Sequence, residues 1–140
     1  MNSFNPPPRT ISRYSPIPII HELGTIYLIL HNAIRDFPKL ERFSIGVSIL
    51  QIILDCIKHC FLATTLPVGT QKLHAVATAS AHFDALKLYV RLSLDMHALE
   101  ESAYLKLIPH FGSIGTMLGG WLKETQKSNS PPETNAPRAR

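Results

Sequence analysis

The 140-residue sequence has few of the residues that stabilise small secreted proteins. It contains only two cysteines, Cys56 and Cys60, whereas a small secreted domain usually carries several disulfide pairs. Its first residues are polar and proline-rich, without the apolar run and small-residue cleavage site of a secretory signal. We therefore expect a cytoplasmic protein without a disulfide framework.

Sequence motifs for catalysis are missing as well. No Glu-x-x-His repeat occurs that would build a di-metal centre inside a helical bundle. The glycines at 112, 115, 119 and 120 follow no strand pattern and do not form a phosphate-binding loop. We expect a non-enzymatic protein with no catalytic residues, no metal and no cofactor.

Strand patterning is absent, and helical patterning takes its place. No useful length of sequence alternates apolar and polar residues, but apolar residues recur at spacings of three and four in four stretches. These stretches cover about residues 18–37, 40–64, 73–96 and 104–122, and short links join them. The pattern predicts an all-α protein, an antiparallel up-down four-helix bundle.

The two ends differ in composition from the middle. Residues 1–16 and 125–140 are rich in proline and small polar residues, which predicts flexible tails around one bundle domain at residues 17–124. The predicted domain holds nine basic and nine acidic side chains, so all of the chain's net charge of +4 lies in the tails. A basic footprint for nucleic acid therefore belongs to the tails and to local patches.

The second predicted helix has two apolar stripes. The more regular stripe steps by 4, 3, 4, 3 and 4 residues, and comprises Phe43, Val47, Leu50, Leu54, Ile57 and Phe61. Beside it run Ile45, Ile49, Ile52, Cys56 and Cys60. We expect this helix to be buried on most of its circumference, which favours contacts between copies of the chain. It carries Asp55 and Lys58, which are costly inside a bilayer, so we do not expect a membrane span.

The fourth predicted helix contains a proline and four glycines. Pro109 is expected to kink or break the helix near Lys106, because proline removes a backbone hydrogen bond. Each glycine costs about 1 kcal/mol relative to alanine inside a helix. Close approach of a neighbouring helix would offset that cost, and the candidates for such packing or for oligomer contacts are Gly115, Gly119, Gly120 and Trp121. Alternatively, Gly119 or Gly120 ends the helix.

Three groups of residues could carry chemistry. Cys56, His59 and Cys60 have the atoms of zinc ligands, but the cysteines lie on an apolar stripe and are expected in the core. Asp55 and His59, one turn apart, are either a proton-transfer pair or an ordinary surface contact, and we favour the contact. Lys87 and Arg91 could bind phosphate, or form a solvated face with Asp84 and Asp95.

Several segments of the sequence resemble a known family. Residues 114–123, with the sequence IGTMLGGWLK, resemble the closing segment of the accessory variability (Avd) proteins of diversity-generating retroelements. Phe37-Pro38-Lys39 with Arg42-Phe43 is similar to the turn between the family's first two helices. Residues 86–92 with Asp95 resemble its third helix, and Tyr104 matches the aromatic residue that opens its fourth.

This resemblance implies a homopentameric barrel of four-helix bundles. It further implies that the protein binds a reverse transcriptase and its template RNA to support mutagenic cDNA synthesis. Lys39, Arg42, Lys87 and Arg91 match basic positions of the family, and become candidate RNA or polymerase contacts. The alternative is a four-helix scaffold that binds RNA or protein, of the kind found in ribosomal intervening sequences, unconnected with a retroelement.

Overall fold

The structure is a computed structural model that describes residues 16–129. Within this range it contains helices and no strands, which confirms the all-α prediction. The elements are α1 (Pro16–Ile34), α2 (Lys39–Glu41), the π-helix η1 (Arg42–Gly46), α3 (Val47–Thr65), α4 (Thr70–Asp95) and α5 (Glu101–Asn129). Because α2, η1 and α3 follow one another without a break, residues 39–65 form one long helix, and the described chain has four.

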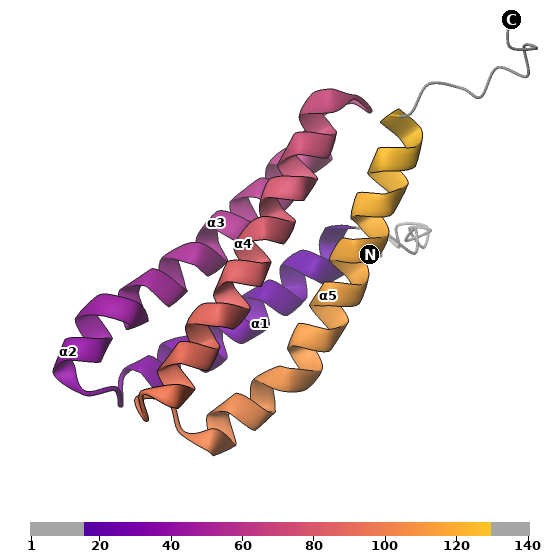
Figure 1. Cartoon of the computed structure of the whole chain (residues 1–140). Coiled ribbons are helices and arrows are strands. Elements are labelled where there is room, and N and C mark those ends of the chain that lie inside the picture. The colour runs from indigo at the N-terminus through magenta and orange to yellow at the C-terminus, as the bar shows by residue number, and fades with distance from the viewer. Residues whose placement is uncertain (1–15, 130–140) are drawn as a thin grey trace, which may run out of the picture.

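The four long helices lie side by side and alternate in direction (Figure 1). α1 packs against α3 and α5, and α4 packs against the same two helices, so that each helix has two neighbours. The link between α3 and α4 holds only residues 66–69, and the link between α4 and α5 only residues 96–100. Short links between antiparallel neighbours are what the helical spacing predicted.

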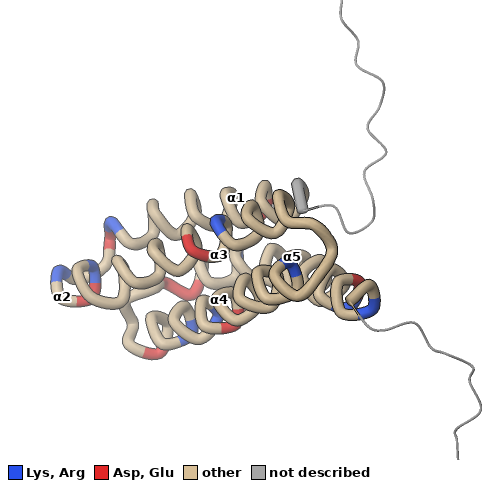
Figure 2. The backbone as a smooth tube through the Cα atoms, turned by 90° about the horizontal axis from the view of Figure 1, so that it is seen from above, with Lys and Arg blue, Asp and Glu red and all other residues tan. Residues whose placement is uncertain are grey.

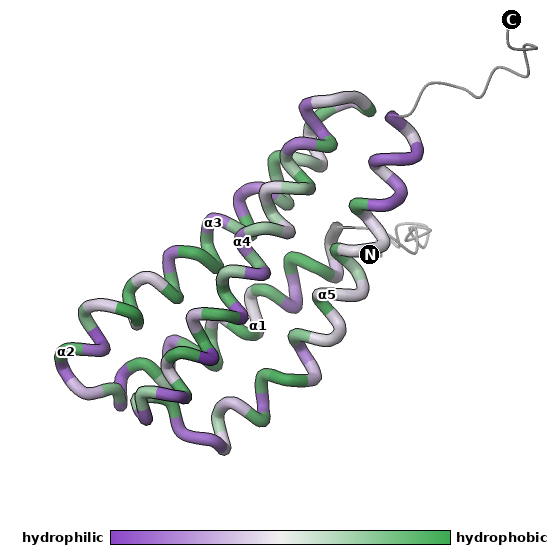
Figure 3. Tube along the Cα trace, in the orientation of Figure 1, coloured by the Kyte–Doolittle hydropathy of each residue, from purple (hydrophilic) through white to green (hydrophobic). Residues whose placement is uncertain are grey.

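One apolar core runs through the centre of the bundle. Every long helix contributes side chains at helical spacing, and the completely buried ones include Ile19, Leu23, Ile26, Leu30, Ile49, Ile53, Cys56, Cys60, Val76, Ala79, Leu86, Val90, Leu107 and Ile114. Figure 3 shows apolar residues recurring along all four helices. Trp121, which we had considered for oligomer contacts, is 5% exposed and belongs to this core.

The turn between α1 and α2 is fixed by a proline and an arginine. α1 ends at Ile34, and the backbone N–H of Phe37 then donates to the carbonyl of Ile34 at 3.0 Å. Pro38 keeps the preceding residue out of helical geometry. Arg42 Nη2 donates to the carbonyl of Phe37 at 3.2 Å, which ties the start of the second long helix back to the turn.

The fourth long helix is longer and more continuous than predicted. Of the kink or break predicted near Lys106, the break is wrong, because α5 runs through Pro109 without interruption. Pro109 is exposed, so water can bond to the Leu105 carbonyl that lacks its helical N–H partner. The helix also continues beyond residue 124, the predicted end of the bundle, and Thr125 is buried. Of the tails predicted at residues 1–16 and 125–140, Pro16 and residues 125–129 are helical, and residues 1–15 and 130–140 lie outside the described residues.

A close contact in the bundle involves Gly46, which was not among the glycines predicted to allow close helix packing. A Cβ atom on Gly46 would lie 2.8 Å from Ile34 Cγ2 and 3.2 Å from the carbonyl oxygen of Glu41. Within the chain, in contrast, nothing lies within 4 Å of a Cβ built on Gly112 or Gly119, and Gly115 would make only an ordinary contact of 3.7 Å with Phe83. Gly46 therefore lets the π-turn η1 pack against the end of α1.

We predict that Gly46→Ala lowers the free energy of unfolding by about 1 kcal/mol at a fixed protein concentration. Overpacking costs about 1–3 kcal/mol, and the gain in helix propensity of about 1 kcal/mol offsets part of it. The matched control Gly112→Ala gains the same propensity in open space, and should be stabilised. Urea unfolding followed by circular dichroism measures both. Equal stabilisation of the two variants would contradict the close approach at Gly46.

Candidate functional site

The regular apolar stripe of residues 39–65 lies mostly outside the core, against which only its Leu50 and Ile57 are partly buried. Phe43, Val47, Leu54 and Phe61 are 66%, 54%, 44% and 63% exposed. Of the second stripe, Ile49, Cys56 and Cys60 are buried instead, together with Ile53 and Ala63, and Ile45 and Ile52 are partly buried. A single chain therefore buries only one side of this helix, and burial on most of its circumference stays a prediction about contacts between copies.

Small side chains explain why the second stripe faces inward. Cys56 and Cys60 on α3 and Ala79 on α4 are all completely buried. Cys56 Sγ donates to the backbone carbonyl of Ala79 at 3.3 Å, a contact that requires the two helices to lie close together. Phenylalanine and leucine in these positions would hold α3 and α4 further apart.

By length and apolar content, residues 39–65 are the one described helix that could cross a membrane. A third of the apolar stretch that meets this criterion is buried in the bundle.

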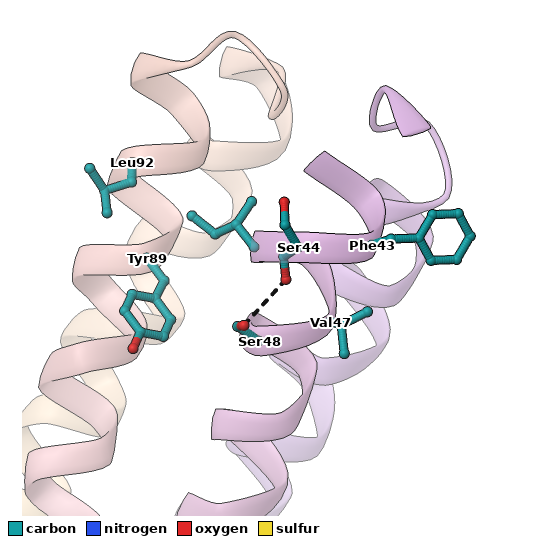
Figure 4. A pocket seen from close by; sticks show the side chains of 7 residues that line it. Phe43, Ser44, Val47, Ser48, Tyr89 and Leu92 are labelled. Carbon is teal, nitrogen blue, oxygen red and sulfur yellow. Dashed lines mark hydrogen bonds between the residues drawn. The ribbon is translucent and has the colours of Figure 1, made fainter. Parts of the chain in front are cut away.

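A groove of about 470 Å³ lies between the start of the second long helix and α4 (Figure 4). It is lined by Phe43, Ser44, Ile45, Val47, Ser48, Tyr89 and Leu92. The hydroxyls of Ser44 and Ser48 donate to the carbonyls of Leu40 and Ser44, at 2.7 and 3.2 Å. Within residues 16–129, neither serine contacts a histidine or a carboxylate that would make it a nucleophile. The groove is therefore suited to receiving an apolar side chain.

The predicted basic contacts at the first turn differ from each other. Lys39 is exposed and forms no ion pair with any residue from 16 to 129. Arg42 is partly buried, is hydrogen-bonded to the Phe37 carbonyl, and lies 6.0 Å from the ring of Phe43. The structure thus gives Arg42 a role in the turn and leaves Lys39 open to solvent.

The predicted basic contacts on α4 each have a carboxylate partner. Lys87 Nζ lies 3.3 Å from Asp84 Oδ1, and Arg91 Nε lies 3.3 Å from Asp95 Oδ1. The Arg91 guanidinium also lies 6.0 Å from the ring of Tyr104 on α5. A hydrogen bond with Tyr104, and secondarily the Asp95 charge, raise the pKa of Arg91 above its usual value. Arg91 is therefore held toward α5, whereas Arg42 is held at the α1–α2 turn.

The cysteine and histidine cluster has the features of core packing. Both thiols are completely buried, and a hydrogen bond with Cys60, together with burial, raises the pKa of Cys56. His59 Nδ1 lies 2.7 Å from the backbone carbonyl of Asp55, and the Asp55 carboxylate accepts from Gln51 instead of pairing with His59. Among residues 16–129, no three or more metal-binding side chains come together.

A contact between the first and last helices was not anticipated. His110 Nδ1 on α5 lies 2.7 Å from Glu22 Oε2 on α1, with the two side chains 30% and 26% exposed. The residues are 88 positions apart, so no local spacing relates them. The contact joins α1 to α5, the first and last helices of the bundle.

The four long helices have a counterpart in a known family. The model of the bAvd-like family matches residues 21–125, which includes most of α1 and α5 and all of the helices between them. The chain belongs to the bAvd-like family. Avd proteins are known as accessory, non-catalytic proteins. No curated protein and no solved structure matched the chain.

We predict that neither thiol of the folded bAvd-like protein reacts with a chromogenic disulfide reagent within minutes, at pH 7 or at pH 9. A thiol reacts as its thiolate, and because the pKa of Cys56 is raised, higher pH should not speed its reaction as it speeds that of a free cysteine. Both thiols should react after unfolding in guanidinium. Rapid reaction of the folded protein at pH 9 would show an accessible, ionisable thiol.

Proposed function

We propose that this protein is the accessory protein of a diversity-generating retroelement, and that it binds the reverse transcriptase and the template RNA during mutagenic cDNA synthesis. Membership of the bAvd-like family, over residues 21–125, carries this proposal. The exposed apolar stripe and the exposed charged face of α4 support it, because an accessory protein acts through surfaces.

We further propose that the chain assembles as a homopentamer through the stripe formed by Phe43, Val47, Leu50, Leu54, Ile57 and Phe61. Its alternating steps of four and three are the spacing of a helix that packs against another helix. Burying a large apolar side chain contributes about 1.5–3 kcal/mol. Four such side chains are therefore comparable to the whole stability of a typical domain, about 5–15 kcal/mol. Covering the stripe is therefore strongly favourable in free energy.

We predict that Val47→Glu combined with Phe61→Glu reduces the mass of the assembly to that of one chain. Both changes place a charge inside the proposed contact, whereas in a monomer both positions are exposed. The matched control, Gln51→Glu with Lys58→Glu, introduces two glutamates on the polar side of the same helix and should keep the assembly. Light scattering measures the masses, and circular dichroism checks folding. An unchanged mass of the first variant would place the contact elsewhere.

Charge limits how the described part of the chain can bind RNA. Residues 16–129 hold ten basic and nine acidic side chains, and Figure 2 shows the two signs interspersed along the helices. RNA affinity comes largely from cations that replace the counterions of phosphates. In our proposal, this charge comes from Lys39, which is exposed to solvent, and from four arginines of the sequence outside the described range, Arg9, Arg13, Arg138 and Arg140.

We predict that the wild-type chain forms a complex with the reverse transcriptase encoded beside its gene and with the template RNA, and that cDNA synthesis requires it. RNA affinity should fall about tenfold between roughly 50 and 200 mM salt, as for two to three phosphate contacts. Lys39→Glu should weaken RNA binding, and the control Lys58→Gln should change it little. Full cDNA synthesis without the protein would contradict the proposal. RNA binding without any affinity for the polymerase would favour the scaffold of the ribosomal intervening-sequence type.

A further inference from the structure

Two histidines from neighbouring helices meet on the surface of the bundle. His59 on α3 and His82 on α4 have ring centres 5.1 Å apart, and their ring planes are tilted by 48°. Both residues are partly buried. His59 also lines a groove of about 490 Å³ between the end of α3 and the start of α4, so solvent and small ions can reach its ring. Neither histidine belongs to the outer stripe or to the candidate RNA contacts.

The directions of the two helices bring these side chains together. Side chains on an α-helix lean toward its N-terminus, and α3 and α4 run antiparallel (Figure 1). Cys56 of α3 donates to the carbonyl of Ala79 of α4, and each histidine stands three residues after one member of this contact. The two rings therefore lean toward each other from opposite directions. The close packing of two rigid helices fixes their positions.

A backbone contact fixes the position of the proton on the His59 ring. Nδ1 of His59 lies 2.7 Å from the carbonyl oxygen of Asp55. A carbonyl oxygen can only accept a hydrogen bond, so Nδ1 carries the proton, and in the neutral ring Nε2 keeps a free lone pair. Histidines that bind metal ions commonly have this arrangement, in which one ring nitrogen donates to a backbone carbonyl and the other coordinates the ion. His59 is thus oriented to coordinate through Nε2.

The separation of the two rings fits a shared metal ion. Bonds of about 2 Å from zinc to an imidazole nitrogen, at a tetrahedral angle, place two ring centres about 5 Å apart. The observed separation of 5.1 Å agrees with this distance, and the tilt of 48° excludes parallel stacking as the reason for the contact. Imidazole ligands suit zinc, nickel and copper, whereas magnesium and calcium prefer oxygen ligands.

We propose that His59 and His82 together bind one zinc ion per chain, which links α3 to α4. Within residues 16–129, no third histidine, cysteine or carboxylate joins them, and the nearby thiols of Cys56 and Cys60 are buried in the core. In the proposed site, water therefore takes the two remaining tetrahedral positions. The ion stabilises the folded chain. This inference goes beyond the accessory function and does not depend on it, because it needs neither RNA nor polymerase.

The first test measures zinc binding by isothermal titration calorimetry, on the full chain freed of metal with EDTA and then dialysed. The wild-type chain should bind one zinc ion per chain. His59→Gln and His82→Gln should each weaken binding about tenfold or more, because each removes one of only two protein ligands. The matched control is His31→Gln, which removes an exposed histidine of α1. Its zinc affinity should stay within about twofold of the wild type, because residues without shared partners act independently.

The second test compares urea unfolding with and without an excess of zinc, followed by circular dichroism at a fixed protein concentration. An ion that binds the folded chain raises the free energy of unfolding by mass action. Zinc should therefore raise the urea midpoint of the wild type and of His31→Gln, and should leave that of the double variant His59→Gln with His82→Gln nearly unchanged. Each variant without zinc is its own reference, so a change in its intrinsic stability does not affect the comparison.

Several results would overturn the zinc site. A double variant that binds zinc as tightly as the wild type would show that the ion is held by other residues, and so would loss of binding in His31→Gln. One ion for every two chains would indicate an ion shared between copies, against the proposal. A wild-type chain that binds no zinc at millimolar concentrations would exclude the site. The accessory function would stand after any of these results, because it does not require the ion.

Discussion

Residues 39–65 form a helix that is apolar on two sides, and one four-helix bundle can cover only one of them. The second long helix has α1 and α4 as neighbours, and these bury the face that carries Ile49, Ile53 and Cys56. The face with Phe43, Val47 and Phe61 remains in solvent. Small side chains on the inner face, above all the thiols of Cys56 and Cys60, allow α3 to pack closely against Ala79 of α4. The outer face, with two phenylalanines, is left for another molecule.

The start of that helix determines which of its faces points outward. At its start, Gly46 and the π-turn let the chain pass beneath the end of α1, and Arg42 is tied to the turn. This places Phe43 and Val47 on the outside while Ile49 enters the core. A π-turn contains one residue more than an α-turn, so it shifts which residues face inward on its two sides. Such turns are often found at functional sites, and here the turn borders the groove toward α4.

Much of the fold followed from the sequence, because helical spacing is a local property. The four helices begin and end within a few residues of their predicted limits, apart from the extension of α5 to Asn129. The ion pairs of Lys87 and Arg91 were also foreseeable from spacings of three and four. The inward face of α3 was not, because both of its stripes have the same period and only contact with α4 distinguishes them. The pair of Glu22 and His110 depends on the packing of α1 against α5, which no local pattern encodes.

In the assembly that we propose, other copies of the chain cover the outer stripe of residues 39–65. Light scattering of the wild-type protein, coupled to size-exclusion chromatography and repeated over a hundredfold dilution, tests it directly. We expect a single species with the mass of five chains of 15.6 kDa that persists on dilution. A species with the mass of one chain at every concentration would contradict it.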